Sequence, residues 1–232
     1  MTDGGMTALV IDDEPQIRRA VRNALAQDFD DVLEAGSAGD GIDLAAARRP
    51  GLIVLDLALP DRPGVEVCRE IRKWSVSPII VLSARHAESE KITLLEAGAD
   101  DYVTKPFSPA ELRARARAQL RRAATGANPG GEPVELDGLH IDIGARRIDR
   151  DGQEIHLTPT EWELLRVLVR NAGRTMTHAR LFSSVWARSG GDPQQYLRVY
   201  VAQLRRKIER DPVRPRLIIT EPGVGYRFAD IG

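Results

Sequence analysis

Polar residues stand just past the ends of short apolar runs at several places in the first half of this 232-residue chain. They are Asp12, Asp13, Asp56, Ser83 and Lys105. One further run ends at Glu34 and interrupts the series. The carboxyl ends of parallel strands line one edge of a sheet, where such folds bind ligands, so we expect these groups to converge. Three carboxylates, a hydroxyl and an ammonium group suit a site that binds Mg²⁺ and holds a phosphoryl group.

Each of these residue types has a role in phosphoryl transfer. Asp56 stands alone after the central apolar run, and a carboxylate there can act as the nucleophile that forms an aspartyl phosphate. Asp12 and Asp13 offer hard oxygen ligands for Mg²⁺. Lys105 would neutralise one phosphoryl oxygen, and Ser83 would hydrogen-bond another. The alternative is that Asp12 and Asp13 only cap the following helix, but that would leave the other residues unexplained.

Apolar runs alternate with helical patterns through the first 122 residues. Strands are predicted at 8–11, 32–35, 52–55, 79–82 and 101–104, and helices at 15–27, 39–47, 65–73, 88–97 and 109–122. Pro15 and Pro109 suit the first position of a helix. This alternation predicts an α/β domain with a doubly wound, five-stranded parallel sheet covered on both faces.

The pattern changes after residue 124. Residues 125–133 (TGANPGGEP) have no periodicity and predict a flexible linker. We therefore expect one domain at 1–124 and a second at 134–232. The second contains short strand-like pieces, helices at 159–171, 178–186 and 194–210, and a closing hairpin of strands 217–220 and 226–229. This order predicts a smaller winged-helix α+β domain.

Composition excludes several classes of protein. The chain is 42% hydrophobic, enough for ordinary cores, yet no apolar stretch approaches the ~20 residues that span a bilayer. The start has no signal-peptide pattern, and either Met1 or Met6 could be the initiator. The single cysteine, Cys68, excludes an internal disulfide and fits a buried thiol in a reducing cytosol. We expect a soluble cytoplasmic protein.

Charge is distributed unevenly along the chain. Residues 1–124 contain 17 Lys and Arg against 20 Asp and Glu, whereas residues 194–216 contain seven Lys and Arg against two acidic residues. A local basic stripe is typical of a nucleic-acid-binding surface. The alternative is a solvated helix face without a partner.

The predicted helix at 194–210 has the pattern of a helix that reads DNA. One side carries a line of apolar residues, and the other side has a mixed polar and small character that suits the major groove of double-stranded DNA. Its candidate contacts are Gln195, Tyr196, Arg198, Val199, Gln203, Arg205 and Arg206. The arginines would contact phosphates, and the two glutamines favour adenine, so A·T-rich half-sites are expected.

Four motifs resemble the receiver domain of two-component response regulators. They are Val10-Ile11-Asp12-Asp13-Glu14, Leu55-Asp56, Ser83-Ala84 and Lys105-Pro106-Phe107. The resemblance implies a flavodoxin-like sheet of order 2-1-3-4-5 and a phosphoryl group that passes from a sensor histidine kinase to Asp56. It also implies Mg²⁺ bound by Asp12, Asp13, Asp56 and the backbone carbonyl of Ala58.

The same resemblance implies a conformational switch and a dimer. Ser83 and Tyr102 match the switch pair of receivers, and the Lys105–Pro106 bond is expected to be cis. The stretch from Lys91 to Tyr102, with Glu111 and Arg115, resembles the receiver dimer face of the OmpR/PhoB subfamily. The implied homodimer face, formed on phosphorylation, comprises Lys91, Ile92, Leu95, Asp101, Glu111 and Arg115. Read from spacing alone, these charges would be solvated i,i+4 pairs.

The second half resembles the winged-helix effector of that subfamily. The matching motifs are Leu157-Thr158-Pro159-Thr160-Glu161, Leu204-Arg205-Arg206-Lys207-Ile208-Glu209 and Gly225-Tyr226-Arg227-Phe228. The resemblance implies that Arg227 reaches the minor groove, although an ordinary strand arginine is the alternative. It also implies tandem half-sites in promoters, ~10–11 bp apart, and RNA polymerase as a further partner.

Two shorter stretches resemble one group of regulators within this subfamily. Tyr196-Leu197-Arg198-Val199-Tyr200 and Asp211-Pro212-Val213-Arg214-Pro215-Arg216 resemble the Kdp-type regulators of high-affinity potassium uptake. This implies a potassium-sensing kinase and potassium-transport genes as targets.

An enzyme with an aspartyl-phosphate intermediate is the alternative class. Such phosphatases carry an Asp-x-Asp motif, whose second carboxylate acts as acid and base. Ala58 stands at that position here. Without the second carboxylate the phosphoryl group should persist, which a switch requires, so we predict a transcription factor rather than an enzyme.

Overall fold

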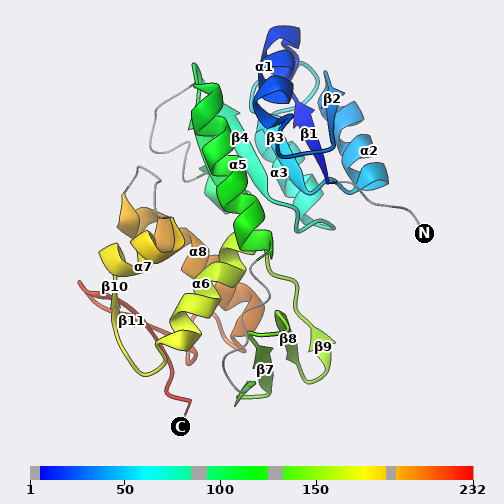
Figure 1. Cartoon of the computed structure of the whole chain (residues 1–232). Helices are drawn as coiled ribbons and strands as arrows, with labels where there is room; N and C mark the ends of the chain where they lie inside the picture. Colours follow the sequence, from blue (N-terminus) through cyan, green and yellow to red (C-terminus); the bar gives the residue numbers. More distant parts are fainter. Residues whose placement is uncertain (1–5, 85–92, 125–132, 187–191, 232) are drawn as a thin grey trace. The chain divides into compact units, whose positions relative to one another are not determined.

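The chain folds into two compact units, residues 1–123 and residues 124–232 (Figure 1). The structure is a computed structural model that describes residues 6–84, 93–124, 133–186 and 192–231. The predicted linker at 125–133 lies outside the described residues except for Pro133.

A five-stranded parallel sheet forms the centre of the first unit. Its strands are β1 (Thr7–Ile11), β2 (Asp31–Ala35), β3 (Leu52–Asp56), β4 (Ile79–Ser83) and β5 (Asp101–Thr104). The order is β2-β1-β3-β4-β5, and every neighbouring pair is parallel, which confirms the predicted topology. Strands β3 and β4 are buried along their whole length. Such continuous apolar runs are typical of parallel strands covered on both faces.

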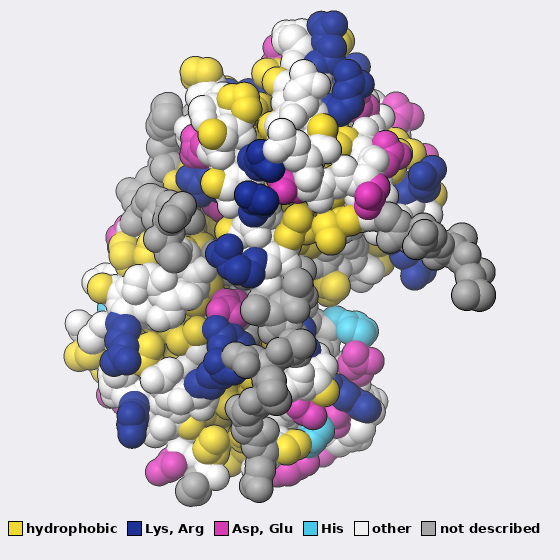
Figure 2. Space-filling model, viewed as in Figure 1, with side chains coloured by type: hydrophobic (Ala, Val, Ile, Leu, Met, Phe, Trp, Pro, Cys, Tyr) yellow, Lys and Arg dark blue, Asp and Glu magenta, His cyan; other side chains and the backbone are white. Residues whose placement is uncertain are grey.

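Helices cover this sheet (Figure 1). They are α1 (Pro15–Leu25), α2 (Ala38–Arg48), α3 (Gly64–Arg72) and α5 (Pro109–Ala124). Residues 93–96 are also helical, and the first part of the helix predicted at 88–97 lies outside the described residues. Val21 and Leu25 of α1 and Leu112 of α5 share one hydrophobic cluster with the strands. Lys and Arg side chains gather at the end of this unit where α1 lies (Figure 2).

The second unit joins two small sheets to three helices. Its elements are β6 (Val134–Leu136), β7 (Leu139–Asp142), β8 (Arg147–Arg150), β9 (Gln153–Glu154), α6 (Pro159–Arg170), β10 (Met176–Thr177), α7 (His178–Val185), α8 (Pro193–Ile208), β11 (Ile218–Glu221) and β12 (Gly225–Phe228). The sheets have the orders β6-β7-β8-β9 and β10-β12-β11. Asp137–Gly138 and Asp151–Gly152 have positive φ at both residues, as tight hairpin turns require.

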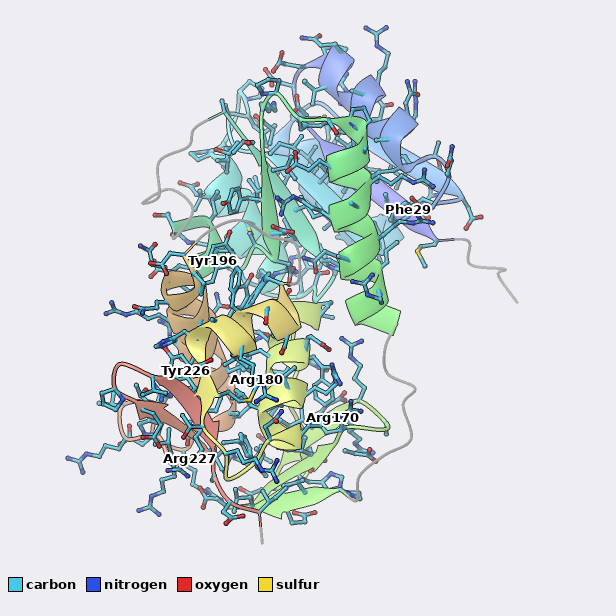
Figure 3. All side chains as sticks on the ribbon, turned by 60° about the vertical axis from the view of Figure 1, so that its left-hand side comes forward. Phe29, Arg170, Arg180, Tyr196, Tyr226 and Arg227 are labelled. Carbon is cyan, nitrogen blue, oxygen red and sulfur yellow. The ribbon has the colours of Figure 1, made fainter. Side chains whose placement is uncertain are left out.

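Aromatic side chains fill the space between α7 and α8. The Tyr196 ring lies 5.5 Å from the Phe182 ring and 5.8 Å from the Trp186 ring, measured between centroids. Figure 3 labels Tyr196 on α8. The Trp186 ring also lies 5.0 Å from the Tyr200 ring. Large buried aromatic surfaces contribute strongly to packing, so this cluster fixes α8 on the body of the unit.

Two general expectations from the sequence can be compared with the structure. Cys68 is buried and donates its thiol proton to the carbonyl of Ala97 at 3.4 Å, and burial raises the pKa of this thiol to about 11. The prediction of a buried thiol is therefore confirmed. Within the described ranges, no helix is both long and apolar enough to traverse a lipid bilayer.

Candidate functional site

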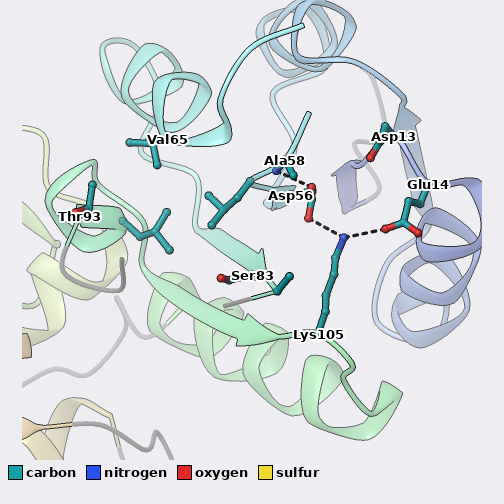
Figure 4. A pocket seen from close by; sticks show the side chains of 11 residues that line it. Asp13, Glu14, Asp56, Ala58, Val65, Ser83, Thr93 and Lys105 are labelled. Atoms are coloured by element: carbon teal, nitrogen blue, oxygen red, sulfur yellow. Dashed lines mark hydrogen bonds and ion pairs between the residues drawn. The ribbon is translucent and has the colours of Figure 1, made fainter. Parts of the chain in front are cut away.

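The predicted polar groups meet at the carboxyl edge of the parallel sheet. The Nζ atom of Lys105, just after β5, lies 2.6 Å from Oδ1 of Asp56 (Figure 4). It also lies 2.8 Å from Oδ2 of Asp12. Asp56 ends β3, Asp12 follows β1, and Ser83 ends β4. Groups that are more than 90 residues apart in sequence are thus joined at the point where the strand order reverses.

This cluster is largely removed from water. Asp12 is 0% exposed, Asp56 4% and Ser83 3%. Burial raises the pKa of Asp12, partly offset by its bonds to the Lys105 ammonium and to the Glu14 amide. Burial also works against the charge of Lys105, but hydrogen bonds and attraction from Asp12 and Asp56 outweigh it and raise the Lys105 pKa. The ammonium therefore stays charged and holds two carboxylates together.

A cavity of about 690 Å³ opens onto Asp56 (Figure 4). Its polar lining residues are Asp13, Glu14, Asp56, Ser83, Thr93 and Lys105, and its other lining residues are Leu57, Ala58, Val65, Ala84 and Leu94. Sequence reasoning missed Glu14, whose Oε1 lies 3.6 Å from Nζ of Lys105. The cavity offers one nucleophilic carboxylate beside a cation, with a hydroxyl on the neighbouring strand.

The loop after β3 is fastened on both sides. The Ala58 amide donates to Oδ2 of Asp56 at 2.8 Å, which fixes the carboxylate's orientation. The carboxylate of Asp61 accepts the amides of Ala38 at 2.8 Å and Gly39 at 3.0 Å, at the start of α2. These bonds lower the pKa of Asp61. Asp61 was also missed, because nothing in the local sequence distinguishes it from a solvated loop carboxylate.

The donor chemistry of this edge fits Mg²⁺. Among the described residues no group of three or more His, Cys, Asp or Glu side chains is arranged as a metal site. Lys105 separates Asp12 from Asp56, and Asp13 is exposed. Mg²⁺ in proteins requires only one or two carboxylates together with water and phosphate oxygens. With Glu14, the carboxylates outnumber the single ammonium, so a divalent cation would balance the charge.

The expected switch residues lie on adjacent strands. Ser83 pairs with Thr104 in the β4–β5 register, and Tyr102 stands two residues earlier on β5, facing the same side. The Tyr102 side chain is buried, at 8% exposure. The Lys105–Pro106 peptide bond is cis, as the resemblance to receivers implies.

The structure describes only part of the predicted dimer face. Lys91 and Ile92 lie outside the described residues. Arg115 pairs within one chain, with Asp101 at 3.0 Å and with Glu111 at 3.1 Å. Leu95 is 1% exposed. This conformation does not present Leu95 to a second copy, and its place in the phosphorylated dimer face stays a prediction.

Helix α8 presents a narrower polar face than the sequence pattern predicts. Arg198 and Arg206 are exposed, and Gln195 and Gln203 are half-buried. Tyr196 and Val199 are 4% and 8% exposed. Both side chains lie on the buried side of α8, so their prediction as groove contacts is wrong. For Tyr196 the reason is its packing in the aromatic cluster with α7.

Arg205 also differs from its prediction as a phosphate contact. Its guanidinium donates to the carbonyl of Ile218 from Nε at 3.0 Å and from Nη2 at 2.5 Å, and it reaches Oγ1 of Thr220 at 2.9 Å. It therefore ties α8 to β11 instead of pointing to solvent. Arg227 on β12 pairs with Glu221 at 3.0 Å.

Comparison with known proteins places both units. Residues 8–117 match the family model described as response regulator receiver domain, and residues 152–228 match the model described as transcriptional regulatory protein, C terminal. The KDP operon transcriptional regulatory protein KdpE of Escherichia coli is 48% identical over 221 residues, which cover 95% of this chain and 97% of that protein. KdpE of Mycobacterium tuberculosis (strain CDC 1551 / Oshkosh) is 46% identical over 220 residues, with the same coverage.

Solved structures agree with this placement. The crystal structure of the response regulator DrrB, a Thermotoga maritima OmpR/PhoB homologue, has a TM-score of 0.52 and 34% identity, with 97% of this chain and 99% of that chain covered. A mutant form of the protein RitR, at 22% identity and TM-score 0.74 over 97% of this chain and 100% of the other, shares the fold. The chain therefore belongs to the OmpR/PhoB-type response regulators and resembles KdpE, with a receiver domain followed by a winged-helix-type DNA-binding domain.

Proposed function

We propose that this protein is a transcription factor activated by transfer of a phosphoryl group from a sensor histidine kinase to Asp56. The observation that carries the proposal is the buried contact between Oδ1 of Asp56 and Nζ of Lys105 at 2.6 Å, at the wall of an open cavity. The DNA-binding unit on the same chain supplies the output.

The residues at the site have separate roles in the transfer. An oxygen of Asp56 attacks the phosphorus of the kinase's phosphohistidine, and the P–N bond breaks as the imidazole nitrogen leaves with the electron pair. Lys105 holds the Asp56 carboxylate in place and then contacts a phosphoryl oxygen. Asp12, Asp13, Asp56 and the carbonyl of Ala58 would hold Mg²⁺, which neutralises phosphoryl oxygens when bound.

The residue at one position of the site favours a switch over a phosphatase. The residue two positions after Asp56 is Ala58, which lines the cavity without an acid or base. The relatives are transcriptional regulators. We infer that the acyl phosphate on Asp56 lasts long enough for Ser83 to contact it and for Tyr102 to change its packing.

Phosphorylation is proposed to assemble a homodimer. The described residues available for its face are Glu111, Ala114 and Arg115 of α5, and the other predicted contacts, Lys91 and Ile92, lie outside the described residues. Asp101 already pairs with Arg115 in one chain, so a cross-subunit pair would require Arg115 to exchange partners.

Replacing both Lys91 and Glu111 with alanine should weaken the phosphorylated dimer about tenfold, because two symmetry-related ion pairs of ~0.2–1 kcal/mol each are lost. Sedimentation equilibrium with Mg²⁺ and beryllium fluoride, which mimics the phosphoryl group, measures the dimer affinity. The exposed pair Glu70 and Lys73 at the end of α3 gives a matched double-alanine control. Equal dimer affinity in wild type and in the Lys91/Glu111 variant would exclude this face.

DNA binding is proposed for the exposed stripe of α8. Three residues of this stripe are Gln195, Arg198 and Arg206. Their spacing places them on one side of the helix, with Gln203 beside them. Arg227 is proposed to reach the minor groove after releasing Glu221. The arginines would supply phosphate contacts and the glutamines contacts to adenine.

Arg198→Ala and Arg206→Ala should each reduce the slope of log affinity against log salt by about one, because each removes about one phosphate contact. Fluorescence anisotropy with a fixed duplex at several salt concentrations measures this slope. Arg170→Ala is the control, since Arg170 is an exposed arginine of the same unit outside α8. A slope unchanged by both α8 variants would place the interface elsewhere.

The proposed targets are potassium-transport genes, with RNA polymerase as a further partner. This rests on the likeness to KdpE of Escherichia coli, whose name links it to the KDP operon. Genomic fragments retained by the protein in the presence of Mg²⁺ and beryllium fluoride can be sequenced. We expect tandem A·T-rich half-sites upstream of a potassium-pump operon. Enrichment of G·C-rich sites at unrelated genes would contradict the target assignment.

A further inference from the structure

The side chain of Arg18 lies against the backbone of Asp12 and Asp13. This residue lies in the first turns of α1, and its Nη1 atom donates to the carbonyl of Asp12 at 2.7 Å and to that of Asp13 at 3.1 Å. One guanidinium nitrogen therefore bridges two successive carbonyls of the loop that carries both carboxylates. The Arg18 side chain is only 19% exposed.

Glu34 orients this arginine from the neighbouring strand. Its Oε2 accepts Nε of Arg18 at 3.3 Å, and its Oε1 accepts Nη1 of Arg22 at 2.8 Å. Glu34 is the residue of β2 that interrupted the series of polar groups at the strand ends. Gly36, just after β2, lies beside this guanidinium, and a Cβ there would meet Nη1 of Arg18 at 3.4 Å, an ordinary contact.

Other bonds to the acidic loop come from the backbone and from Lys105, and the Asp12 amide donates to the carbonyl of Ala35 at the end of β2 at 3.1 Å. Glu14, at the N-cap of α1, makes no side-chain capping bond, and Pro15 has no amide hydrogen to donate. The Asp12 carboxylate receives the Glu14 amide at 2.9 Å and Lys105 at 2.8 Å. Asp13 is exposed. Among the described residues, the side chain that bonds to its backbone is that of Arg18.

We propose that Arg18, oriented by Glu34, is a positioning residue that presets the Asp12–Asp13 loop for divalent-cation binding. Groups that orient metal ligands from behind are commonly worth 10-fold or more in metal affinity. Arg18 contacts only backbone carbonyls of the loop, so it touches neither the cation nor the phosphoryl group. Its effect acts through the placement of the two carboxylates.

Arg18→Ala should raise the dissociation constant for Mg²⁺ about tenfold in the unphosphorylated full chain, measured by calorimetric titration with Mg²⁺ alone. Arg22→Ala is the matched control, since Arg22 pairs with the same Glu34 and, among the described residues, no bond joins it to the loop. Its dissociation constant should stay within about twofold of wild type. Arg18→Lys, which keeps the charge but lacks the planar fork of donors, should fall between the two.

A second readout needs no cation. Hydrogen exchange at the Asp13 and Glu14 amides of the metal-free protein should speed up in Arg18→Ala and stay unchanged in Arg22→Ala. Glu34→Gln tests the same link without removing the guanidinium, and it should raise the dissociation constant by about threefold. If Arg18→Ala fails to fold, the dissociation constant of Glu34→Gln for Mg²⁺ tests the role of Arg18 in its place.

The inference rests on the proposed Mg²⁺ site, and the titration separates the two. Wild-type protein that binds no Mg²⁺ would overturn the metal site itself. Wild-type binding that is unaltered in Arg18→Ala and Glu34→Gln would leave the site standing and overturn the role of Arg18.

Discussion

Asp56→Asn should abolish incorporation of labelled phosphate from acetyl phosphate in the presence of Mg²⁺. The amide keeps the shape of the side chain and can still accept the Ala58 amide, but its oxygen is not the anionic nucleophile that forms an acyl phosphate. The label on wild-type protein should be released by hydroxylamine, which cleaves acyl phosphates. Scintillation counting of the precipitated protein measures both quantities.

Asp43→Asn is the matched control for this substitution. Asp43 is an exposed residue of α2, away from the residues that line the cavity, and the variant should incorporate label as wild type does. Label that persists in Asp56→Asn would show that another carboxylate, such as Asp13, accepts the phosphoryl group.

Gly64→Ala should destabilise the receiver by about 3 kcal/mol, the upper part of the usual range for overpacking. A Cβ at this position would lie 2.2 Å from the carbonyl oxygen of Asp56 and 2.8 Å from Cα of Leu57, so the backbone at the phosphoacceptor must move. The Gly64 amide also donates to the Leu57 carbonyl at 2.9 Å, and this bond would be strained. Phosphorylation should slow as well.

Peptide-resolved hydrogen exchange measures this loss within the full chain. Peptides from β3 and β4 should exchange about 100-fold faster in Gly64→Ala, since each 1.4 kcal/mol is tenfold, while peptides from the second unit should not change. Gly39→Ala is the control. Its Cβ would meet Asp61 at 3.7 Å, an ordinary contact, and alanine is the better helix former. A wild-type exchange rate in Gly64→Ala would contradict the close approach at Asp56.

The receiver could be predicted from sequence because two simple periodicities determine it. Buried parallel strands appear as continuous apolar runs such as Ile79–Ser83. Each helix between them has apolar residues at helical spacing on one face. The carboxyl ends of the strands then place the reactive side chains at one edge of the sheet, as the contact between Asp56 and Lys105 shows. Described element boundaries differ from the predictions by at most two residues, the usual scatter at frayed ends.

What the sequence could not show depends on contacts between elements. The spacing of Arg205 suits a phosphate contact. Its guanidinium donates instead to the carbonyl of Ile218 on β11. Tyr196 was predicted on the outer side of α8, yet Phe182 of α7 packs against its ring and the residue is buried. Val199, predicted on the same side, is buried as well. Arg18 reaches the acidic loop only through backbone carbonyls, which leaves no pattern of residue types to detect.

The central claim is that phosphorylation of Asp56 controls DNA affinity. The most direct measurement is the equilibrium affinity of the full chain for one tandem site it retains, with and without Mg²⁺ and beryllium fluoride. We predict an increase of about 100-fold for wild type, because dimerisation makes the second half-site binding intramolecular, and no increase for Asp56→Asn. Equal affinity of the wild type in both states would contradict the account.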